Sequence, residues 1–185
     1  MRHFEVRFCT VTVAALLAAA PVLAQKDTRD RVGNQPAQAD RITREVRHEL
    51  VMLPYYGVFD DLSYRVNGGV VTLMGYVTRP TLKSDAEKVV SHIEGVEKVD
   101  NQIKVLPLSS QDDQIRRNVY RAIYSQPGLD RYALQAVPPI HIIVDNGKVA
   151  LEGVVASQAD RDQANIRAQG VPGVFSVENH LRVEK

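Results

Sequence analysis

The stretch from Val66 to Val77, VNGGVVTLMGYV, occurs twice in this chain. Its second copy begins 78 residues further on, from Val144 to Val155, and reads VDNGKVALEGVV. Valines, glycines and a leucine keep their positions in both copies, and the agreement continues without a gap to the end of each copy. A repeat at a fixed interval indicates that the chain is built from two copies of one module.

The apolar residues of the first copy predict two strands, a helix and a third strand. Residues 62–66 alternate apolar and polar side chains, as a strand with one buried face does. Asn67-Gly68-Gly69 follows and favours a hairpin turn, because asparagine and glycine tolerate positive φ. An amphipathic helix opens at Pro80 and stops at Gly95, and residues 96–105 carry the last strand.

Another helix precedes the strands in each module. In the first module Asp40 is the expected N-cap, and the helix ends before Pro54. In the second module Ser110 followed by Asp113 resembles a capping box. The second copy is longer between this helix and its first strand, so residues 129–139 form an insert.

Each second strand also contains a glycine, Gly75 or Gly153. A glycine weakens a strand unless another part of the chain must come close. Its recurrence predicts that a helix crosses the sheet at this point.

These elements predict an α+β fold with two tandem αββαβ modules, each a small three-stranded sheet with two helices on one face. The first module is expected over residues 40–106 and the second over residues 112–185, with residues 107–111 as the connector.

The first 24 residues read as a secretory signal peptide. Arg2 and Arg7 precede an apolar run that is too short to span a bilayer, and small residues before Gln25 predict cleavage after Ala24. A short membrane anchor is the alternative. Residues 25–39 are polar and predict a flexible leader. Because a signal peptide directs secretion, the modules are expected in the periplasm.

Composition excludes several functional classes. The single cysteine, Cys9, lies in the predicted signal peptide, so the mature chain has no thiol chemistry. Its near-neutral charge argues against a nucleic-acid partner. The remaining histidines lack metal-ligand spacing, and no carboxylate set suits acid–base catalysis, so neither a metal, a cofactor nor an enzyme is expected. These histidines are His48, His92, His141 and His180.

Two units that each carry V-x-x-G-x-V-x-L-x-G-x-V, then G-V and V-x-N-x-[IL]-x-V, resemble the tandem BON-domain proteins of the bacterial periplasm. The resemblance implies a non-enzymatic role at the cell envelope, with binding to phospholipid membranes, osmotic-stress tolerance and outer-membrane integrity. It brings no catalytic residue to this chain. Some dual-domain relatives are lipoproteins, and this chain, without a lipobox cysteine, is similar to the soluble branch.

The first helix of the second module and the residues that follow it are the candidate lipid site. Arginine can meet lipid phosphate while tyrosine lies at the headgroup level, so an anionic phospholipid surface is the expected partner. The alternative is a solvated helix face whose tyrosines pack on the other module. An envelope protein bound by exposed sheet edges, or by the insert, is the competing partner. The candidate residues are Arg116, Arg117, Tyr120, Arg121, Tyr124 and Arg131.

Overall fold

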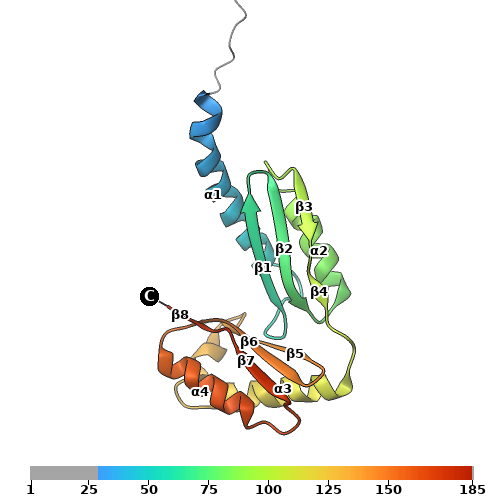
Figure 1. The fold of residues 1–185 in the computed structure, drawn as a ribbon, viewed down its shortest axis with the longest axis vertical. Coiled ribbons are helices and arrows are strands. Elements are labelled where there is room, and N and C mark those ends of the chain that lie inside the picture. The colour runs from blue at the N-terminus through green and yellow to red at the C-terminus, as the bar shows by residue number, and fades with distance from the viewer. Residues whose placement is uncertain (1–28, 185) are drawn as a thin grey trace, which may run out of the picture.

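The computed structural model describes residues 29–184, with side chains from Gln38 onward. The predicted signal peptide and its cleavage site after Ala24 lie outside the described residues. Figure 1 shows two modules that follow one another along the chain. The first contains α1 (Arg29–Val51), β1 (Asp61–Asn67), β2 (Val70–Val77), α2 (Pro80–Ser91), β3 (Lys98–Asn101) and β4 (Lys104–Val105). The second contains α3 (Ser110–Tyr124), the short 3-10 helix η1 (Asp130–Leu134), β5 (Ile140–Asp145), β6 (Lys148–Val155), α4 (Gln158–Gln169), β7 (Ser176–Asn179) and β8 (Arg182–Val183).

The two sheets have the same topology. In the first module β1 pairs antiparallel with β2, and β3 and β4 both pair in parallel with β2. In the second module β5, β6, β7 and β8 repeat this arrangement. Each predicted third strand is therefore one strand in two pieces, and the predicted α+β fold with two similar modules is confirmed.

The interruption of each third strand has a local cause in the repeated asparagine. Asn101 accepts a hydrogen bond from the backbone N–H of Ile103 and donates one to the Lys83 carbonyl on α2. Asn179 does the same between Leu181 and Arg161 of α4. The asparagine thus fastens the helix to the strand where the strand bends, which explains its place in the motif.

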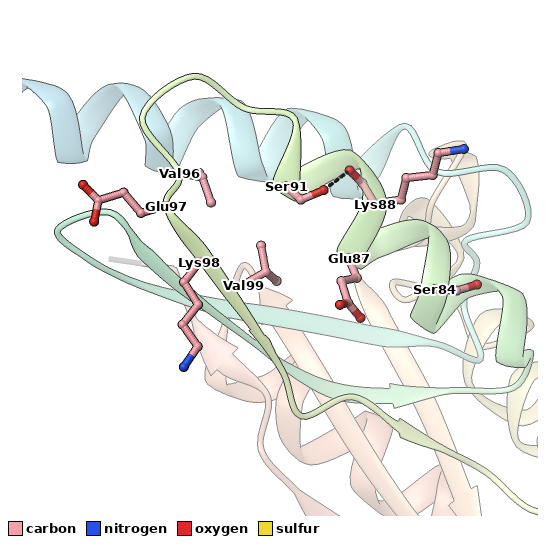
Figure 2. Close-up of a pocket in the computed structure, with 8 residues that line it drawn as sticks. All are labelled: Ser84, Glu87, Lys88, Ser91, Val96, Glu97, Lys98 and Val99. Atoms are coloured by element: carbon pink, nitrogen blue, oxygen red, sulfur yellow. Dashed lines mark hydrogen bonds between the residues drawn. The ribbon is translucent and has the colours of Figure 1, made fainter.

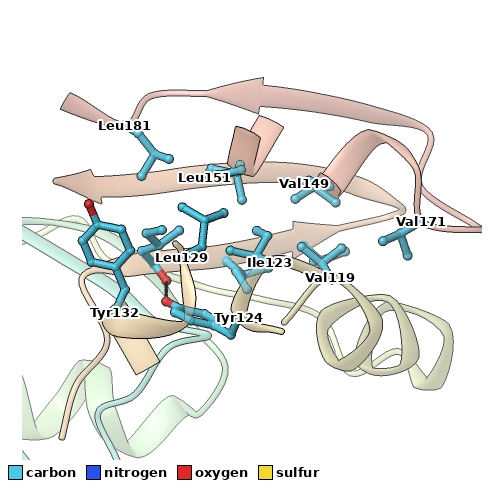
Figure 3. Packing of buried hydrophobic residues seen from close by; sticks show 14 of the residues in the cluster. Val119, Ile123, Tyr124, Leu129, Tyr132, Val149, Leu151, Val171 and Leu181 are labelled. Carbon is cyan, nitrogen blue, oxygen red and sulfur yellow. Dashed lines mark hydrogen bonds between the residues drawn. The ribbon is translucent and has the colours of Figure 1, made fainter. Parts of the chain in front are cut away.

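Each module encloses its own apolar core between the helices and one face of the sheet. Figure 3 shows the second core, in which side chains from α3 meet those of the central strands. Within residues 29–184 no helix is long and apolar enough to cross a bilayer.

Both first helices begin elsewhere than predicted. α1 already starts at Arg29, so Asp40 lies inside the helix and is not its N-cap, and part of the predicted flexible leader is helical. Apolar periodicity marks only the packed part of a helix, so a polar extension gives no signal. The cap of α3 is Ser109 rather than Ser110, and its side chain accepts a hydrogen bond from the Asp112 N–H.

The prediction that a helix crosses the sheet at the strand glycines is wrong. Gly75 and Gly153 have φ of +115° and +122°, a region that strongly favours glycine. A Cβ on Gly75 would collide with the backbone carbonyl of Asp61, and a Cβ on Gly153 would collide with that of Pro139. In neither case is the colliding group part of a helix. The repeated glycine therefore permits a distortion at the entry of the first strand of each module.

Candidate functional site

The position of α3 is fixed from its first turn. The buried carboxylate of Asp112 accepts hydrogen bonds from the backbone N–H groups of Asn146 (3.0 Å) and Gly147 (2.9 Å) in the turn between β5 and β6. Because this carboxylate joins the start of the helix to the tip of the hairpin, the helix lies along the outer edge of β5. The candidate side chains are therefore divided between that edge and solvent.

Arg116 lies on the edge side and is buried. Its side chain is 4% exposed, forms an ion pair with Asp113, and donates from Nη2 to the Val144 carbonyl at 2.6 Å. It is thus a structural cation that cannot reach a membrane surface.

Tyr124 is buried in the same row, as Figure 3 shows. Its hydroxyl donates to the Ile140 carbonyl at 2.7 Å, and burial raises the pKa of this phenol. The hydroxyl is consequently occupied within the fold.

The side chain of Arg131 lies at the first turn of α4. It pairs with Asp160 at 2.6 Å, and its guanidinium lies over the ring of Tyr132. Burial alone would raise the pKa of Asp160, but hydrogen bonds from Ser157 and Tyr132 and the charge of Arg131 lower it. Because the carboxylate offsets its charge, Arg131 belongs to a network that fixes the insert.

The other three candidates lie together. Arg117 and Arg121 are exposed, and Tyr120 is half-buried between them. They line a groove of about 500 Å³, which we call the α3 groove. Among residues 38–184 neither arginine has an acidic partner. The groove is completed by Val58, Phe59, Ala133, Gln135, Ala136 and Pro138.

One wall of the α3 groove comes from the first module. The Phe59 ring meets the Tyr120 ring edge-on, with centroids 6.2 Å apart. The Val58 carbonyl accepts a hydrogen bond of 2.8 Å from the Ile142 N–H on the outer edge of β5. The groove therefore exists only where the two modules meet.

His141 lies at the same junction. It points away from the core of its own module, as the alternation predicts, but its ring stacks on Tyr56 of the first module at 5.6 Å between centroids and is 9% exposed. It is therefore a buried interface residue.

Sequence reasoning missed the residues beyond α3. A second groove, of about 590 Å³, lies between α3 and α4 and shares Arg121 with the first. It adds Arg167 and Ile166, whose side chain is 65% exposed. The sequence of α4 carries one signal for this groove. The helix buries only Ala164 and Ala168, and Ile166 lies outside that narrow apolar face, so its side chain has no core to enter. Val58 and Phe59 gave no signal, since they come from the other module.

The other cavities offer weaker arrangements. Figure 2 shows a pocket of about 430 Å³ between α2 and β3, where the charged ends of Lys88, Glu97 and Lys98 point away from one another. No cluster of three or more metal-ligating side chains occurs among the described residues. The α3 groove brings two arginines without an acidic partner among residues 38–184 to an apolar wall.

Comparisons with known proteins agree with the repeat. The sequence matches the BON domain twice, over residues 38–107 and 111–185. It is 32% identical over 127 residues to osmotically-inducible protein Y of Escherichia coli (strain K12), a match that covers 67% of this chain and 62% of that protein. Among solved structures, CdsD, a structural protein of the Type III secretion system of Chlamydia trachomatis, aligns over 78% of this chain and 92% of its own with 13% identity and a TM-score of 0.31. Its C-terminal domain aligns over 77% and 96% with 13% identity and a TM-score of 0.27.

Proposed function

This chain belongs to the BON-domain family, and from that premise we propose that it docks reversibly on anionic phospholipid surfaces of the cell envelope. It does so through the second module and performs no chemistry. Its relative in Escherichia coli is named for osmotic induction, so the proposed setting is the periplasm of an osmotically stressed cell.

The observation that carries the proposal is the pair of exposed, unpaired arginines beside an apolar wall. Arg117 and Arg121 are one turn apart on α3 and reach the same groove. A guanidinium binds phosphate oxygens through several N–H groups at once. The neighbouring Tyr120 suits the interface between headgroups and acyl chains, where amphipathic aromatic rings concentrate, and Phe59 adds apolar surface beside it.

The free cations define the docking surface more narrowly than the six sequence candidates do. The surface consists of Arg117, Tyr120 and Arg121 on α3 with Ile166 and Arg167 on α4. Each cation near an anionic surface contributes about 1 kcal/mol, so three give about 3 kcal/mol. Binding is therefore weak, reversible and sensitive to salt.

Co-sedimentation with vesicles tests the proposal. The mature chain is mixed with vesicles containing phosphatidylglycerol or with purely zwitterionic vesicles, at low and at high salt. We expect it to pellet with the anionic vesicles alone and to lose binding at high salt. The variant Arg117→Glu/Arg121→Glu should remain in the supernatant, because it reverses both free charges.

The matched control is Arg44→Glu/Arg47→Glu, which makes the same change in charge on the exposed face of α1. It should pellet as the unmodified chain does. Equal loss of binding in the two variants would mean that net charge, rather than the α3 surface, drives association. Failure of the unmodified chain to pellet would overturn the proposal.

A protein-interaction module is the alternative function. Docking through free arginines weakens with ionic strength, whereas pairing along a strand edge changes little with salt. Salt-independent retention of a protein partner, without pelleting on vesicles, would favour that alternative.

A further inference from the structure

The outer edge of β5 is partly covered. Two residues separate β5 from β6, so Ile140, Ile142 and Val144 direct their backbone groups away from β6. Tyr124 donates to the Ile140 carbonyl, Arg116 donates to the Val144 carbonyl, and Val58 accepts from the Ile142 N–H. Two side chains of α3 and one segment of the first module therefore occupy three of the six backbone groups that a further strand would use.

The corresponding edge of β1 is covered at Leu62, whose backbone the Tyr56 phenol reaches, but not beyond it. By the same pairing, Leu62, Tyr64 and Val66 direct their backbone groups away from β2. Among the described residues none hydrogen-bonds to the Tyr64 N–H or the Val66 carbonyl. At Tyr64 and Val66 this edge is therefore open, whereas the equivalent groups of Ile142 and Val144 are bonded.

The difference follows from two positions in the first helices. The repeat aligns Arg116 with Thr43 and Tyr124 with Val51. Threonine is too short to reach the strand edge, and valine has no hydroxyl to donate. An exposed strand edge with free N–H and C=O groups is a template for an added strand.

The second module shows what such an edge accepts. Its occupant is the segment Val58-Phe59, which bonds to the strand through one carbonyl and packs its side chains on the core and on Tyr120. Two acidic residues, Asp60 and Asp61, follow this segment directly. An apolar pair that lies in a turn and is followed by acids therefore occupies part of one of the two equivalent edges.

The charges beside the β1 edge favour the same chemistry. Arg44 and Arg47 hold the places of Arg117 and Tyr120 in the repeat, and both are exposed. Arg65 is exposed on β1 itself. Among residues 38–184 none of these cations has an acidic partner, whereas Arg41, on another side of α1, pairs with Glu45.

We propose that the open edge of β1 binds an extended, apolar–acidic segment of another protein, by strand addition at Tyr64 and Val66. The partner is defined by this chemistry: an apolar pair that enters between α1 and β1, and following carboxylates that meet Arg44, Arg47 or Arg65. The site lies in the first module, so it is independent of lipid docking by the second.

A peptide with the sequence of residues 55–61, YYGVFDD, is the probe. Its binding to the mature chain is measured by fluorescence anisotropy, and the site is located by amide hydrogen exchange. We expect slower exchange at Tyr64 and Val66 in the presence of peptide. The variant Thr43→Arg/Val51→Tyr copies the cover of β5, and Asp40 stands where Asp113 pairs with Arg116. It should bind about tenfold more weakly, because the peptide loses backbone hydrogen bonds.

Two further variants keep the test decisive. Thr43→Ser/Val51→Ala alters the same positions, leaves the edge open and should bind normally. Arg65→Glu changes an exposed side chain and should weaken binding of the acidic peptide. The proposal is overturned if Thr43→Arg/Val51→Tyr folds and binds as tightly as the unmodified chain, if protection appears at Ile142 instead of Tyr64, or if no variant and no peptide concentration gives binding.

Discussion

A buried guanidinium is stable only while its partners hold it. Removing a charge from water costs several kcal/mol unless hydrogen bonds replace the lost solvation. Arg116 recovers this cost from Asp113 and from the Val144 carbonyl, although its Nε has no partner among the described residues. The side chain therefore serves the stability of the second module.

Truncation of Arg116 should reveal that role. Arg116→Ala leaves the Val144 carbonyl unsatisfied and opens a cavity beside α3, so we expect the free energy of unfolding to fall by about 3 kcal/mol. Urea denaturation followed by circular dichroism measures the change. Arg117→Ala, one position along and exposed, should alter it by no more than about 0.5 kcal/mol. Equal losses would show that Arg116 has no special structural role.

At this scale the sequence predicted the kind of residue but not its role. Arg116 and Arg117 lie in adjacent rows that both flank the apolar stripe of α3, and helical periodicity does not tell them apart. The position of the β5 edge decides which row is buried, and that is a tertiary fact. The pairing of Arg131 with Asp160 was hidden for the same reason, because the two are distant in sequence.

The strand glycines act at the scale of the element. The backbone of β6 at Gly153 has φ of +122° and passes close to the Pro139 carbonyl. Gly153 pairs with Ile140, the first residue of β5, whose carbonyl accepts the hydrogen bond from Tyr124.

Substitution at this glycine should be costly. Gly153→Ala adds a Cβ against backbone and forces an unfavourable φ, so we expect a loss of about 2–4 kcal/mol in the free energy of unfolding. Gly128 is the matched control, because its φ is +94° but a Cβ there would meet nothing within 4 Å. Gly128→Ala should cost about 1 kcal/mol. Thermal denaturation of the two variants therefore separates the cost of the positive φ, which both share, from the cost of the Cβ contact, which only Gly153→Ala has. A smaller loss at Gly153 than at Gly128 would contradict this account.

Elements with a local cause were predicted well. The turn after Asn67 and the proline that opens α2 follow from residues next to one another. The function of the strand glycines and the start of α1 were wrong, because the first depends on the neighbouring strand and the second lacks apolar periodicity.

The two modules also meet through the outer faces of their sheets. A groove of about 620 Å³ between them is lined by charged residues of both. Burial raises the pKa of Asp61, while a hydrogen bond to Glu152 raises the pKa of His180. Two groups with raised pKa values, one from each module, therefore line this groove.

Stability should depend on pH through His180. Its pKa is raised in the folded state, so its contribution is fully present below about pH 6.5 and is lost as the pH rises through the folded-state value. The side chain is 53% exposed, so the contribution is below about 1 kcal/mol. We expect the unmodified chain to lose more stability than His180→Gln between about pH 5.5 and pH 8, measured by urea denaturation. Parallel profiles would exclude His180 as the cause.

For the whole molecule the repeat predicted two similar modules and left their mutual placement open. The residues that join them, such as Val58 and Ile142, lie in different copies, so no pattern within one copy reveals their contact. The alternation of Ile140, His141 and Ile142 agrees with the outward direction of the His141 ring, but it does not reveal the tyrosine that covers the ring.

The hydrogen bond between Val58 and Ile142 makes the order of the modules matter. The first module supplies the segment that contains Val58, and the second module supplies the strand edge on which this segment lies. The two copies are therefore no longer interchangeable. Exchanging the order of the modules, or appending a third copy after the second, would leave a β5-type strand edge without the segment that covers it. Duplication thus produced a pair with a direction, in which each copy can diverge only as far as the other still fits it.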